Sequence, residues 1–419
     1  MVKSDWNTTH PFITFTAPYE PERFNLKLGE AFSKCQHLSG TPLPPKLAQH
    51  LSHIYFARGI QGTTAIEGNT LSEADVSDVL AGKKQLPESR KYQEVEVLNV
   101  AKALTEIRAE AASGKPFRLT PNWIREQNRQ VLDGLDDLED HVVPGEYTRE
   151  QVVVGSYRPP RPNSVPELVD RLCDWLNSLI EASQDNEKKS DERFLNAFMA
   201  AALGHLYVAW IHPFGDGNGR TARLLEAAIL AHSGVVPWVS CQLLSNFYNE
   251  TRPKYYRKLD RASKAREVSQ FILYSIEGYV DELRDQISVV QAQQRHIAWM
   301  SYVHEVMQNE SEGKPKKRRS RLALALHPDT PTPKDEVPTL ETELAFHYGS
   351  VTPKTVSRDL SALQQLGLVR QLPDGWVANQ AALDAFVPLR ENFETNAIVV
   401  SVPEPFDLAT TEDVEPASL

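Results

Sequence analysis

Residues 212–223 read His-Pro-Phe-Gly-Asp-Gly-Asn-Gly-Arg-Thr-Ala-Arg and gather several reactive side chains in one short stretch. His212 can accept a proton, because the ordinary pKa of an imidazole lies near neutral pH. Asp216 offers a hard oxygen ligand for Mg²⁺. Arg220 and Arg223 can neutralise phosphate oxygens. Together these are the parts needed to hold a magnesium-bound polyphosphate beside a base.

The backbone of the same stretch is rich in glycine, with Gly215, Gly217 and Gly219 around Asn218. Glycine permits positive φ and lets the backbone approach a phosphate without a side chain in the way. We therefore expect the loop amides and Asn218 to cradle phosphate oxygens. A P-loop is excluded because no Gly-Lys-(Ser/Thr) follows, and a dinucleotide fingerprint would need a preceding strand.

Two helices must position this loop. An apolar segment at 194–211 leads into it, and an Ala/Leu-rich segment at 221–230 leads out. Pro213 biases the residue before it away from helical geometry, so the first helix should end near His212. The second helix should begin at the glycines, where unpaired N–H groups and the helix dipole favour an anion.

At every defined position the loop resembles the signature of the Fic family, His-x-Phe-x-(Asp/Glu)-Gly-Asn-Gly-Arg-x-x-Arg. Fic proteins mostly transfer AMP from ATP onto a Ser, Thr or Tyr hydroxyl of a target protein. The resemblance implies ATP as substrate and Mg²⁺ as cofactor. It also implies that His212 deprotonates the hydroxyl, which attacks the α-phosphorus while pyrophosphate leaves. Other family members transfer phosphate or another nucleotide-derived group, or remove AMP, and the sequence leaves these reactions open.

Two further segments resemble parts of the family. Residues 145–162 alternate, are rich in valine at 152–154 and turn at Gly155, which predicts a short hairpin. It occupies the position of the family's flap, which aligns a target segment by strand addition. Tyr255 and Tyr256 resemble the pair that lines the family's adenine pocket, with simple core packing as the alternative.

An upstream motif at Thr63-Thr-Ala-Ile-Glu-Gly68 resembles the family's inhibitory helix, (Ser/Thr)-x-x-x-Glu-(Gly/Asn). Thr63 and Glu67 are one turn apart and share a helix face, and Gly68 then ends the helix. The resemblance implies that Glu67 pairs with Arg223 and takes the place of the γ-phosphate. An exposed helix end of no regulatory consequence is the alternative.

Composition limits the function classes. A chain of 419 residues predicts two to four domains. Its net charge of −11 argues against electrostatic nucleic-acid binding by the chain as a whole. The helix expected at 194–211 contains Asn196, Gly204 and His205, so we expect a buried core helix and no membrane association. The first residues lack an apolar leader, so no secretory signal is expected. The cysteines are few and widely separated, which favours a reducing cytoplasm: Cys35, Cys173 and Cys241.

Apolar spacing predicts a mainly α protein. The resemblance implies a Fic-type helical core with a short β-hairpin flap, and the order of elements at the C-terminal end predicts a winged helix-turn-helix. The proline-rich residues 327–338 are expected to form a linker or an exposed loop. Two short helices and a hairpin around Pro373-Asp374-Gly375 then predict the winged module. Four regions follow: an N-terminal helical region with the inhibitory motif (1–110), a catalytic core (111–283), a long helix with linker and winged helix (284–395), and an acidic disordered tail (396–419).

The winged module leaves two functions open. A basic run from Lys314 to Arg321, together with Lys354 and Arg358 on the second short helix, supports a DNA-binding transcriptional regulator. Against this, Asp359 is expected to neutralise that helix and the whole chain is acidic. We therefore favour protein docking or homodimerisation, with DNA as the alternative partner.

Overall fold

The computed structural model describes residues 6–16, 21–136, 138–155 and 157–384. The acidic tail expected at 396–419 lies outside the described residues. The chain forms two compact units, residues 1–287 and 288–419.

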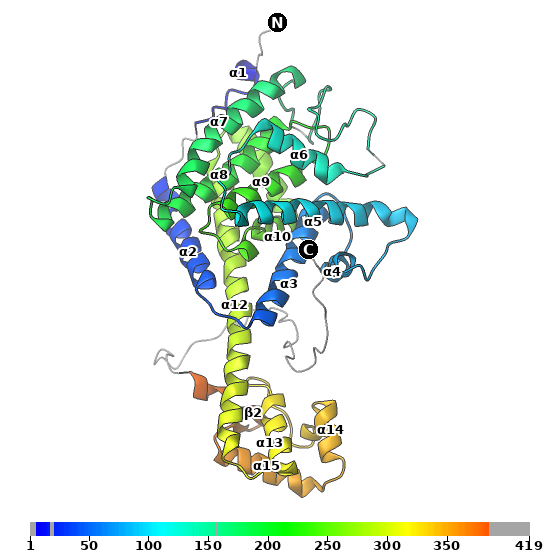
Figure 1. The fold of residues 1–419 in the computed structure, drawn as a ribbon, viewed down its shortest axis with the longest axis vertical. Coiled ribbons are helices and arrows are strands. Elements are labelled where there is room, and N and C mark those ends of the chain that lie inside the picture. The colour runs from blue at the N-terminus through cyan, green and yellow to red at the C-terminus, as the bar shows by residue number, and fades with distance from the viewer. Residues whose placement is uncertain (1–5, 17–20, 137, 156, 385–419) are drawn as a thin grey trace. The chain divides into compact units, whose positions relative to one another are not determined.

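The first unit is helical (Figure 1). Its helices are α1 (Trp6–Thr9), α2 (Pro21–Ser39), α3 (Pro45–Ile66), α4 (Glu73–Leu80), α5 (Lys91–Ala112), α6 (Pro121–Leu132), α7 (Val165–Gln184), α8 (Ser190–Ile211), α9 (Asn218–His232), α10 (Leu243–Glu250), α11 (Arg252–Ala265) and α12 (Ser269–Gln308), whose last residues belong to the second unit. The expected mainly α fold is confirmed.

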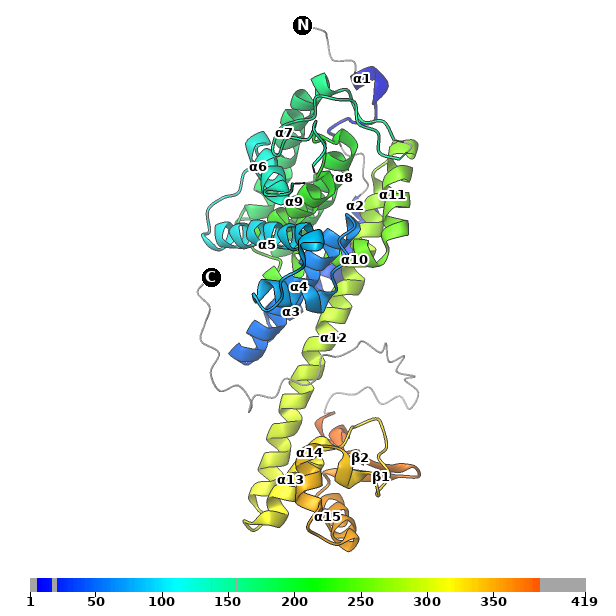
Figure 2. The same cartoon turned by 90° about the vertical axis from the view of Figure 1, so that its right-hand side faces the viewer.

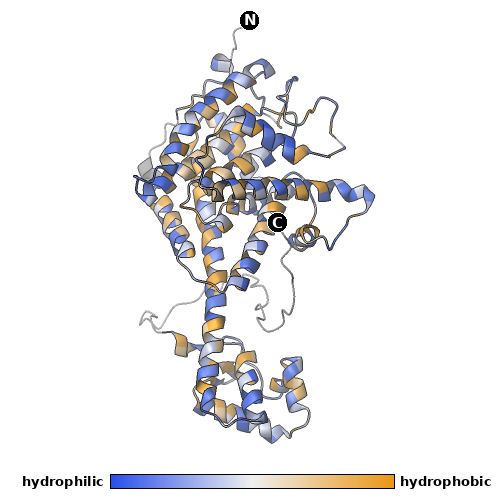
Figure 3. Cartoon of the chain, viewed as in Figure 1, coloured by the Kyte–Doolittle hydropathy of each residue, from blue (hydrophilic) through white to orange (hydrophobic). Residues whose placement is uncertain are grey.

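Helix α8 lies at the centre of the first unit and packs against α7 and α9 (Figure 2). Gly204 permits this packing, because a β-carbon there would already stand 3.1 Å from Leu225 of α9 and 3.2 Å from Leu176 of α7. By length and composition α8 could cross a membrane, but 83% of its apolar window is buried inside the fold. The expected core helix is therefore confirmed, and apolar residues gather where the helices meet (Figure 3).

Helix α3, which ends at the predicted inhibitory motif, packs closely against α10. A β-carbon on Gly62 would stand 2.8 Å from the Ser245 carbonyl oxygen and 2.9 Å from the Asn246 nitrogen. Because those atoms belong to the backbone, only glycine allows this approach. The contact fixes where the C-terminal end of α3 lies.

The second unit contains the last residues of α12, then α13 (Lys314–Ala325), α14 (Thr342–Tyr348), α15 (Pro353–Gln365) and the strands β1 (Val369–Leu372) and β2 (Gly375–Ala378). The strands pair antiparallel, with Val369 opposite Ala378 and Leu372 opposite Gly375. The two short helices and the hairpin expected there are present in that order. A separate apolar cluster includes Trp299, Val303, Leu322 and Leu360.

Residues 327–338 form a largely exposed loop, as expected; Thr332 pairs with Trp376 of β2, and Val337 is fully buried in the unit's core. One expectation for this unit was wrong. Asp359 does not neutralise the outer face of α15. It is buried and pairs with Arg318 at 2.6 Å and Arg319 at 2.9 Å, so it neutralises the basic run instead.

Candidate active site

His212 ends α8 in a left-handed conformation, with φ 49° and ψ 61°. Its N–H still donates to the Val208 carbonyl at 2.8 Å. The expected departure from helical geometry before Pro213 is confirmed. Left-handed backbone is uncommon for residues other than glycine and clusters at functional sites. Here it turns the chain so that the half-buried imidazole borders a cavity.

The imidazole of His212 is neutral at physiological pH. Burial lowers its pKa to about 4, although a hydrogen bond to the Ala209 backbone and the nearby charges of Glu67 and Asp216 act in the opposite direction. A neutral imidazole has a free lone pair, so His212 is in the form that a general base requires.

Helix α9 begins at Asn218, preceded by Gly217 with φ 75°. The side-chain amide of Asn218 is engaged inside the loop: its oxygen accepts from the Phe214 N–H at 3.0 Å, and its nitrogen donates to the Phe214 carbonyl at 2.8 Å. Asn218 therefore fixes the shape of the loop. The expectation that its side chain also cradles phosphate oxygens stays a prediction. Gly215 is needed because a β-carbon there would meet Val142 at 2.9 Å.

Asn128 of α6 holds the loop from outside, a contact that sequence reasoning missed. Its side chain donates to the Asp216 carbonyl at 2.8 Å and accepts from the Gly145 N–H at 3.0 Å. Nearby, the Thr148 N–H donates to the Pro213 carbonyl at 2.9 Å. The loop and the base of the expected flap are thus tied to one another.

Arg220 is buried and bridges two carboxylates. It lies 3.0 Å from Glu96 of α5 and 3.1 Å from Asp216 of the loop. Glu96 also accepts from the Asn69 amide at 3.0 Å. Burial raises the pKa of Glu96, with Arg220 opposing that effect. The side chain of Asp216 is half exposed, so one of its faces is open to solvent.

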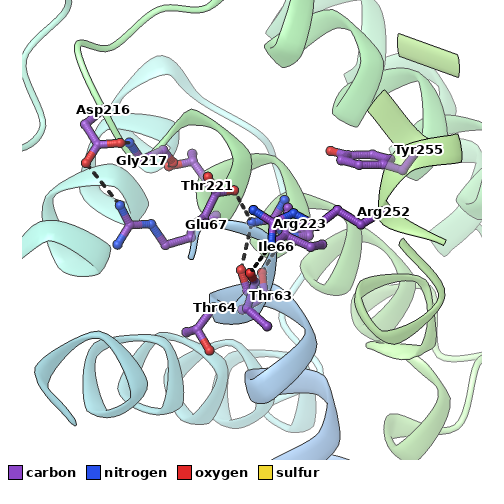
Figure 4. Close-up of polar contacts among 12 residues, drawn as sticks. Thr63, Thr64, Ile66, Glu67, Asp216, Gly217, Thr221, Arg223, Arg252 and Tyr255 are labelled. Carbon is purple, nitrogen blue, oxygen red and sulfur yellow. Dashed lines mark hydrogen bonds and ion pairs between the residues drawn. The ribbon is translucent and has the colours of Figure 1, made fainter. Parts of the chain in front are cut away.

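The predicted pairing of Glu67 with Arg223 is present (Figure 4). One guanidinium nitrogen, Nη2, lies 2.5 Å from the Glu67 carboxylate. The same nitrogen donates to the Thr63 carbonyl at 2.9 Å, and Nε donates to the Thr63 hydroxyl at 2.5 Å. Gly68 follows with φ 106°, a conformation that ends the helix and turns the chain away. Arg223 is thereby bound to both ends of the motif.

The two partners differ in burial: Arg223 is only 2% exposed, whereas the Glu67 side chain is 29% exposed. Burial alone would raise the pKa of Glu67, but the charges of Arg223, Arg220 and Arg252 bring it below its ordinary value. Glu67 is therefore ionised at neutral pH. Its carboxylate lies over the start of α9, where a β-carbon on Gly219 would be 2.3 Å from it.

Helix α11 holds the end of α3 through its carbonyl groups. Arg252 donates to the Ala65 carbonyl at 3.0 Å, and the Tyr256 hydroxyl donates to the Ile66 carbonyl at 3.1 Å. These carbonyls belong to the last turn of α3, where the Ala65 carbonyl also accepts from the Gly68 N–H at 3.0 Å. The arginine also lies over the Tyr256 ring, 5.9 Å from its centre.

A cavity of about 480 Å³ lies beside these groups. Its walls come from α3, α8, α9, α11 and the segment around Gly155. Six residues with predicted site roles line it: Glu67, His212, Asn218, Gly219, Tyr255 and Tyr256. The remaining residues with predicted site roles belong to the 212–223 stretch or to the end of α3 and do not line the cavity: Thr63, Gly68, Gly215, Asp216, Gly217, Arg220 and Arg223.

The two tyrosines of α11 differ in their surroundings. Tyr255 is buried and its hydroxyl lies 2.8 Å from Nε2 of His205, whereas Tyr256 is half exposed. Both face the cavity, together with the apolar Leu259 and Ala209. The result is an aromatic and aliphatic wall in which the planes of the two tyrosine rings are inclined by 44°.

The expected hairpin is reduced to one antiparallel bridge between Val154 and Tyr157, and no strand is formed among the described residues of 145–162. Gly155 has φ 58°, as the tight turn requires. The Tyr157 hydroxyl donates to the Trp210 carbonyl at 2.7 Å, which fastens the turn to the end of α8. Val153 is more than half exposed, so this edge has no partner strand in the described chain.

Comparison with known proteins places these features in context. The family model described as Fic/DOC family matches residues 118–230. "Protein adenylyltransferase Fic" of Drosophila willistoni is 31% identical over 229 residues, covering 55% of this chain and 40% of that protein. The protein of the same name from Aedes aegypti is 29% identical over 259 residues, covering 61% and 46%. The chain thus spans less than half the length of these curated relatives.

Among solved structures, a Fic family protein from Desulfovibrio desulfuricans G20 superposes with a TM-score of 0.50 at 20% identity, covering 87% of this chain and 98% of that one. This likeness concerns the fold. The signature loop and the helices around it lie within the matched segment: residues 118–230 match the Fic/DOC family model.

Proposed function

We propose that this protein is an adenylyltransferase that moves AMP from Mg·ATP onto a Ser, Thr or Tyr hydroxyl of a protein target, itself included, and releases pyrophosphate. The observation that carries the proposal is the meeting of three features at one place. A neutral His212, an anion-binding helix start at Gly219 and an aromatic cavity wall at Tyr255 lie around one cavity. The curated relatives named protein adenylyltransferase support the same activity.

ATP fits this site in one orientation. The adenosine half would lie in the cavity against Tyr255 and Tyr256, because their rings offer an apolar surface. The phosphates would lie over the start of α9, where free N–H groups and the helix dipole attract anions. Arg220 and Arg223 would then neutralise the phosphate oxygens. Both arginines are buried, so their charges are weakly screened.

The reaction follows from this placement. His212 accepts the proton of the target hydroxyl, and the resulting oxygen attacks the α-phosphorus. The new O–P bond forms as the bond from that phosphorus to the bridging oxygen of pyrophosphate breaks. The proton remains on His212 until solvent removes it. The loop amides near Gly219 are positioned to stabilise the charge on the transferred phosphoryl group.

The residues present fit a Mg²⁺ ion that arrives with ATP. Asp216 is half exposed and supplies one hard oxygen ligand, while the described residues contain no cluster of three or more His, Cys, Asp or Glu that could hold a metal alone. Mg²⁺ sites that use one or two carboxylates take their remaining ligands from phosphates and water. When bound, the ion neutralises charge on the leaving pyrophosphate. Asp216 would have to release Arg220 in part to reach it.

We further propose that Glu67 keeps the enzyme in a restrained state. Carboxylate and phosphate both fit a guanidinium fork, so Arg223 cannot bind Glu67 and a γ-phosphate with the same geometry. The 2.5 Å contact shows which anion holds it in this structure. ATP that enters beside the paired carboxylate would be held away from the in-line arrangement that attack requires.

The exposed Val153, next to the bridge between Val154 and Tyr157, supports target binding by strand addition, because it has no neighbouring strand in the described chain. We place the reaction in the cytoplasm, since all three cysteines are free and buried. De-adenylylation is the alternative function. The observation that favours it is that the same base and arginines could direct water onto an AMP-modified side chain.

One experiment separates these activities. The Glu67→Gly variant and the parent protein are incubated with ATP carrying a heavy label in the α-phosphate or in the γ-phosphate. Mass spectrometry then shows which group reaches the protein. AMP transfer adds the α-label and never the γ-label. A γ-label on protein establishes phosphotransfer, whereas loss of AMP from a pre-modified substrate, without any gain, establishes the reverse reaction.

For the second unit we propose a winged helix that docks a protein or a second copy of the chain. Three arginines of the basic run are engaged: Arg318 and Arg319 with Asp359, and Arg321 with Glu341. The charge that favoured DNA is therefore largely neutralised. Binding of a fluorescent DNA duplex to the full chain, with an affinity that falls steeply with salt, would reverse this choice.

A further inference from the structure

A chain of polar groups drawn from three helices leads from the cavity lining, which includes Tyr255 and His205, into the core. Tyr255 of α11 places its hydroxyl 2.8 Å from Nε2 of His205 on α8. On the other side of the imidazole, Nδ1 lies 2.9 Å from a carboxylate oxygen of Glu226 on α9. All three residues are at most 3% exposed. The signature loop does not include any of them.

The carboxylate of Glu226 has two neighbours. Its Oε1 accepts a hydrogen bond from Tyr248 at 3.0 Å, and that hydroxyl also lies 2.9 Å from Ser275. Its Oε2 and the His205 Nδ1 approach each other outside standard hydrogen-bond geometry, and neither has another hydrogen-bond partner among the described residues. Each therefore depends on the other for a polar contact.

The polar partners on the two sides of the imidazole favour one arrangement of the protons. An ionised carboxylate can only accept, so the nitrogen facing Glu226 carries the hydrogen. Because a neutral imidazole has one N–H, the other nitrogen of His205 must accept, and it accepts from the Tyr255 hydroxyl. The phenol proton is thereby directed into the core. Toward the cavity Tyr255 can offer only its ring and the lone pairs of its oxygen.

We infer that Glu226 is a positioning residue for the nucleotide, acting through the tautomer of His205 on the orientation of Tyr255. The inference rests on the proposed function, since it takes the cavity to be the nucleotide site. Without the carboxylate the imidazole can adopt either tautomer. In the second one Nε2 carries the hydrogen and donates to the Tyr255 oxygen, so the phenol hydrogen must rotate toward another acceptor.

Packing alone does not account for Glu226. Carboxylates are seldom fully buried, because removing one from water is costly unless it is paired. An apolar side chain of similar size commonly serves a core as well or better. The carboxylate lies instead where its charge affects the atoms behind the cavity wall. It also contributes to the field at Arg223, one turn earlier on α9.

The test compares three variants of the full chain in the Glu67→Gly background: Glu226→Leu, Glu226→Gln and Tyr248→Phe. Glu226→Leu removes the acceptor for His205. Glu226→Gln retains an oxygen acceptor without the charge. Tyr248→Phe is the matched control, because it removes the other hydrogen bond to the same carboxylate. Steady-state kinetics, Mg·ATP affinity by calorimetry and thermal unfolding are measured for each.

We expect Glu226→Leu to raise KM and Kd for Mg·ATP by about tenfold with kcat changed less than about twofold, because it loosens ground-state binding. Glu226→Gln should restore most of the affinity, and Tyr248→Phe should change KM by less than about twofold. Glu226→Leu combined with Tyr255→Phe should bind no worse than Tyr255→Phe alone, since both act through one hydroxyl. Independent, additive losses would overturn the inference, as would unchanged affinity in a folded Glu226→Leu variant.

A spectroscopic measurement keeps the inference testable if Glu226→Leu does not fold. Nitrogen-15 labelling of histidine, with His205→Gln used to assign the signal, reports the tautomer in the otherwise unaltered protein. We expect a protonated Nδ1 and an unprotonated Nε2, and the opposite tautomer would contradict the inference. If no variant binds Mg·ATP, the proposed function fails. If all bind it equally, only the positioning role fails.

Discussion

The Glu67 carboxylate lies against the backbone of Gly219, so close that a β-carbon on the glycine would be 2.3 Å from it. Gly219 belongs to the first turn of α9, where the N–H groups have no helical partners. The carboxylate therefore competes for the surface that a phosphate needs, as well as for Arg223. Substitution of either residue tests a different part of this competition.

Replacing Glu67 with glycine removes the competing anion and frees Arg223. We expect AMP transfer by Glu67→Gly to rise at least about tenfold, equivalent to about 1.4 kcal/mol of barrier. The measurement is auto-modification with α-labelled ATP. Arg223→Ala should be inactive alone and should abolish the gain in the double variant. A folded Glu67→Gly protein with unchanged or lower activity would show that Glu67 does not inhibit.

Replacing His212 with alanine removes the base and leaves the other residues that line the cavity in place. We expect His212→Ala to reduce AMP transfer by about 10² or more, the usual scale for losing a general base. Calorimetry should show Mg·ATP affinity close to that of the parent, since the phosphate and ring contacts remain. Undiminished auto-modification would remove His212 from the mechanism.

The buried position of His212 also predicts a pH dependence. Its pKa is lowered to about 4, so the free base persists until the solution becomes strongly acidic. In the Glu67→Gly background kcat/KM should therefore not fall between about pH 7 and about pH 6, where an ordinary histidine would begin to protonate. Loss of activity should come at lower pH. A profile with an acid limb near pH 6.5, absent when His212 is replaced, would place the imidazole in water.

The glycine contact between α3 and α10 offers a test that leaves every site residue in place. In Gly62→Ala the new methyl group meets the backbone of Ser245 and Asn246 at less than 3 Å. Overpacking of this kind costs about 1–3 kcal/mol, so the thermal midpoint should fall. Because α3 carries Glu67, AMP transfer below the unfolding temperature should rise. Gly29→Ala is the matched control, since its β-carbon would meet nothing within 4 Å.

The end of the first unit determines where the chain can be shortened. All proposed site residues lie before residue 288, so a chain ending at Ile287 should retain auto-adenylylation. A chain ending at Met307 keeps Trp299 and Val303 without the core that buries them, and we expect it to aggregate. Activity and size-exclusion profiles of the two chains decide the matter. Inactivity of a folded 1–287 chain would give the second unit a part in catalysis.

Local sequence was enough to predict the loop, its flanking helices and the C-terminal end of α3. His212, Gly217 and Gly68 adopt their conformations because of their own residue types and a neighbouring proline. The pairing of Glu67 with Arg223 could be anticipated only from the family resemblance, because 156 residues separate the two.

The supporting contacts had no such signal. Glu96 reaches Arg220 across 124 residues, and Asn128 reaches Asp216 across 88. Nothing in a periodic pattern distinguishes a carboxylate on α5 that faces the site from one that faces water. The sequence predicts that the Asn218 amide binds phosphate. Its hydrogen bonds to Phe214 within the same loop become visible only in the folded backbone. The same reason applies to Asp359, whose burial depends on how α13 packs against α15.

The hydrogen bonds from Arg252 and Tyr256 to the last carbonyls of α3 link release of the inhibitory helix to nucleotide binding. Tyr256 is at once a fastening for the inhibitory helix and part of the surface that would receive adenosine. A partner that pulls α3 away breaks both bonds and leaves that ring without its anchor. Relief of inhibition should therefore raise kcat and weaken ATP binding. The released enzyme should turn over faster at saturating ATP and have a higher KM for ATP.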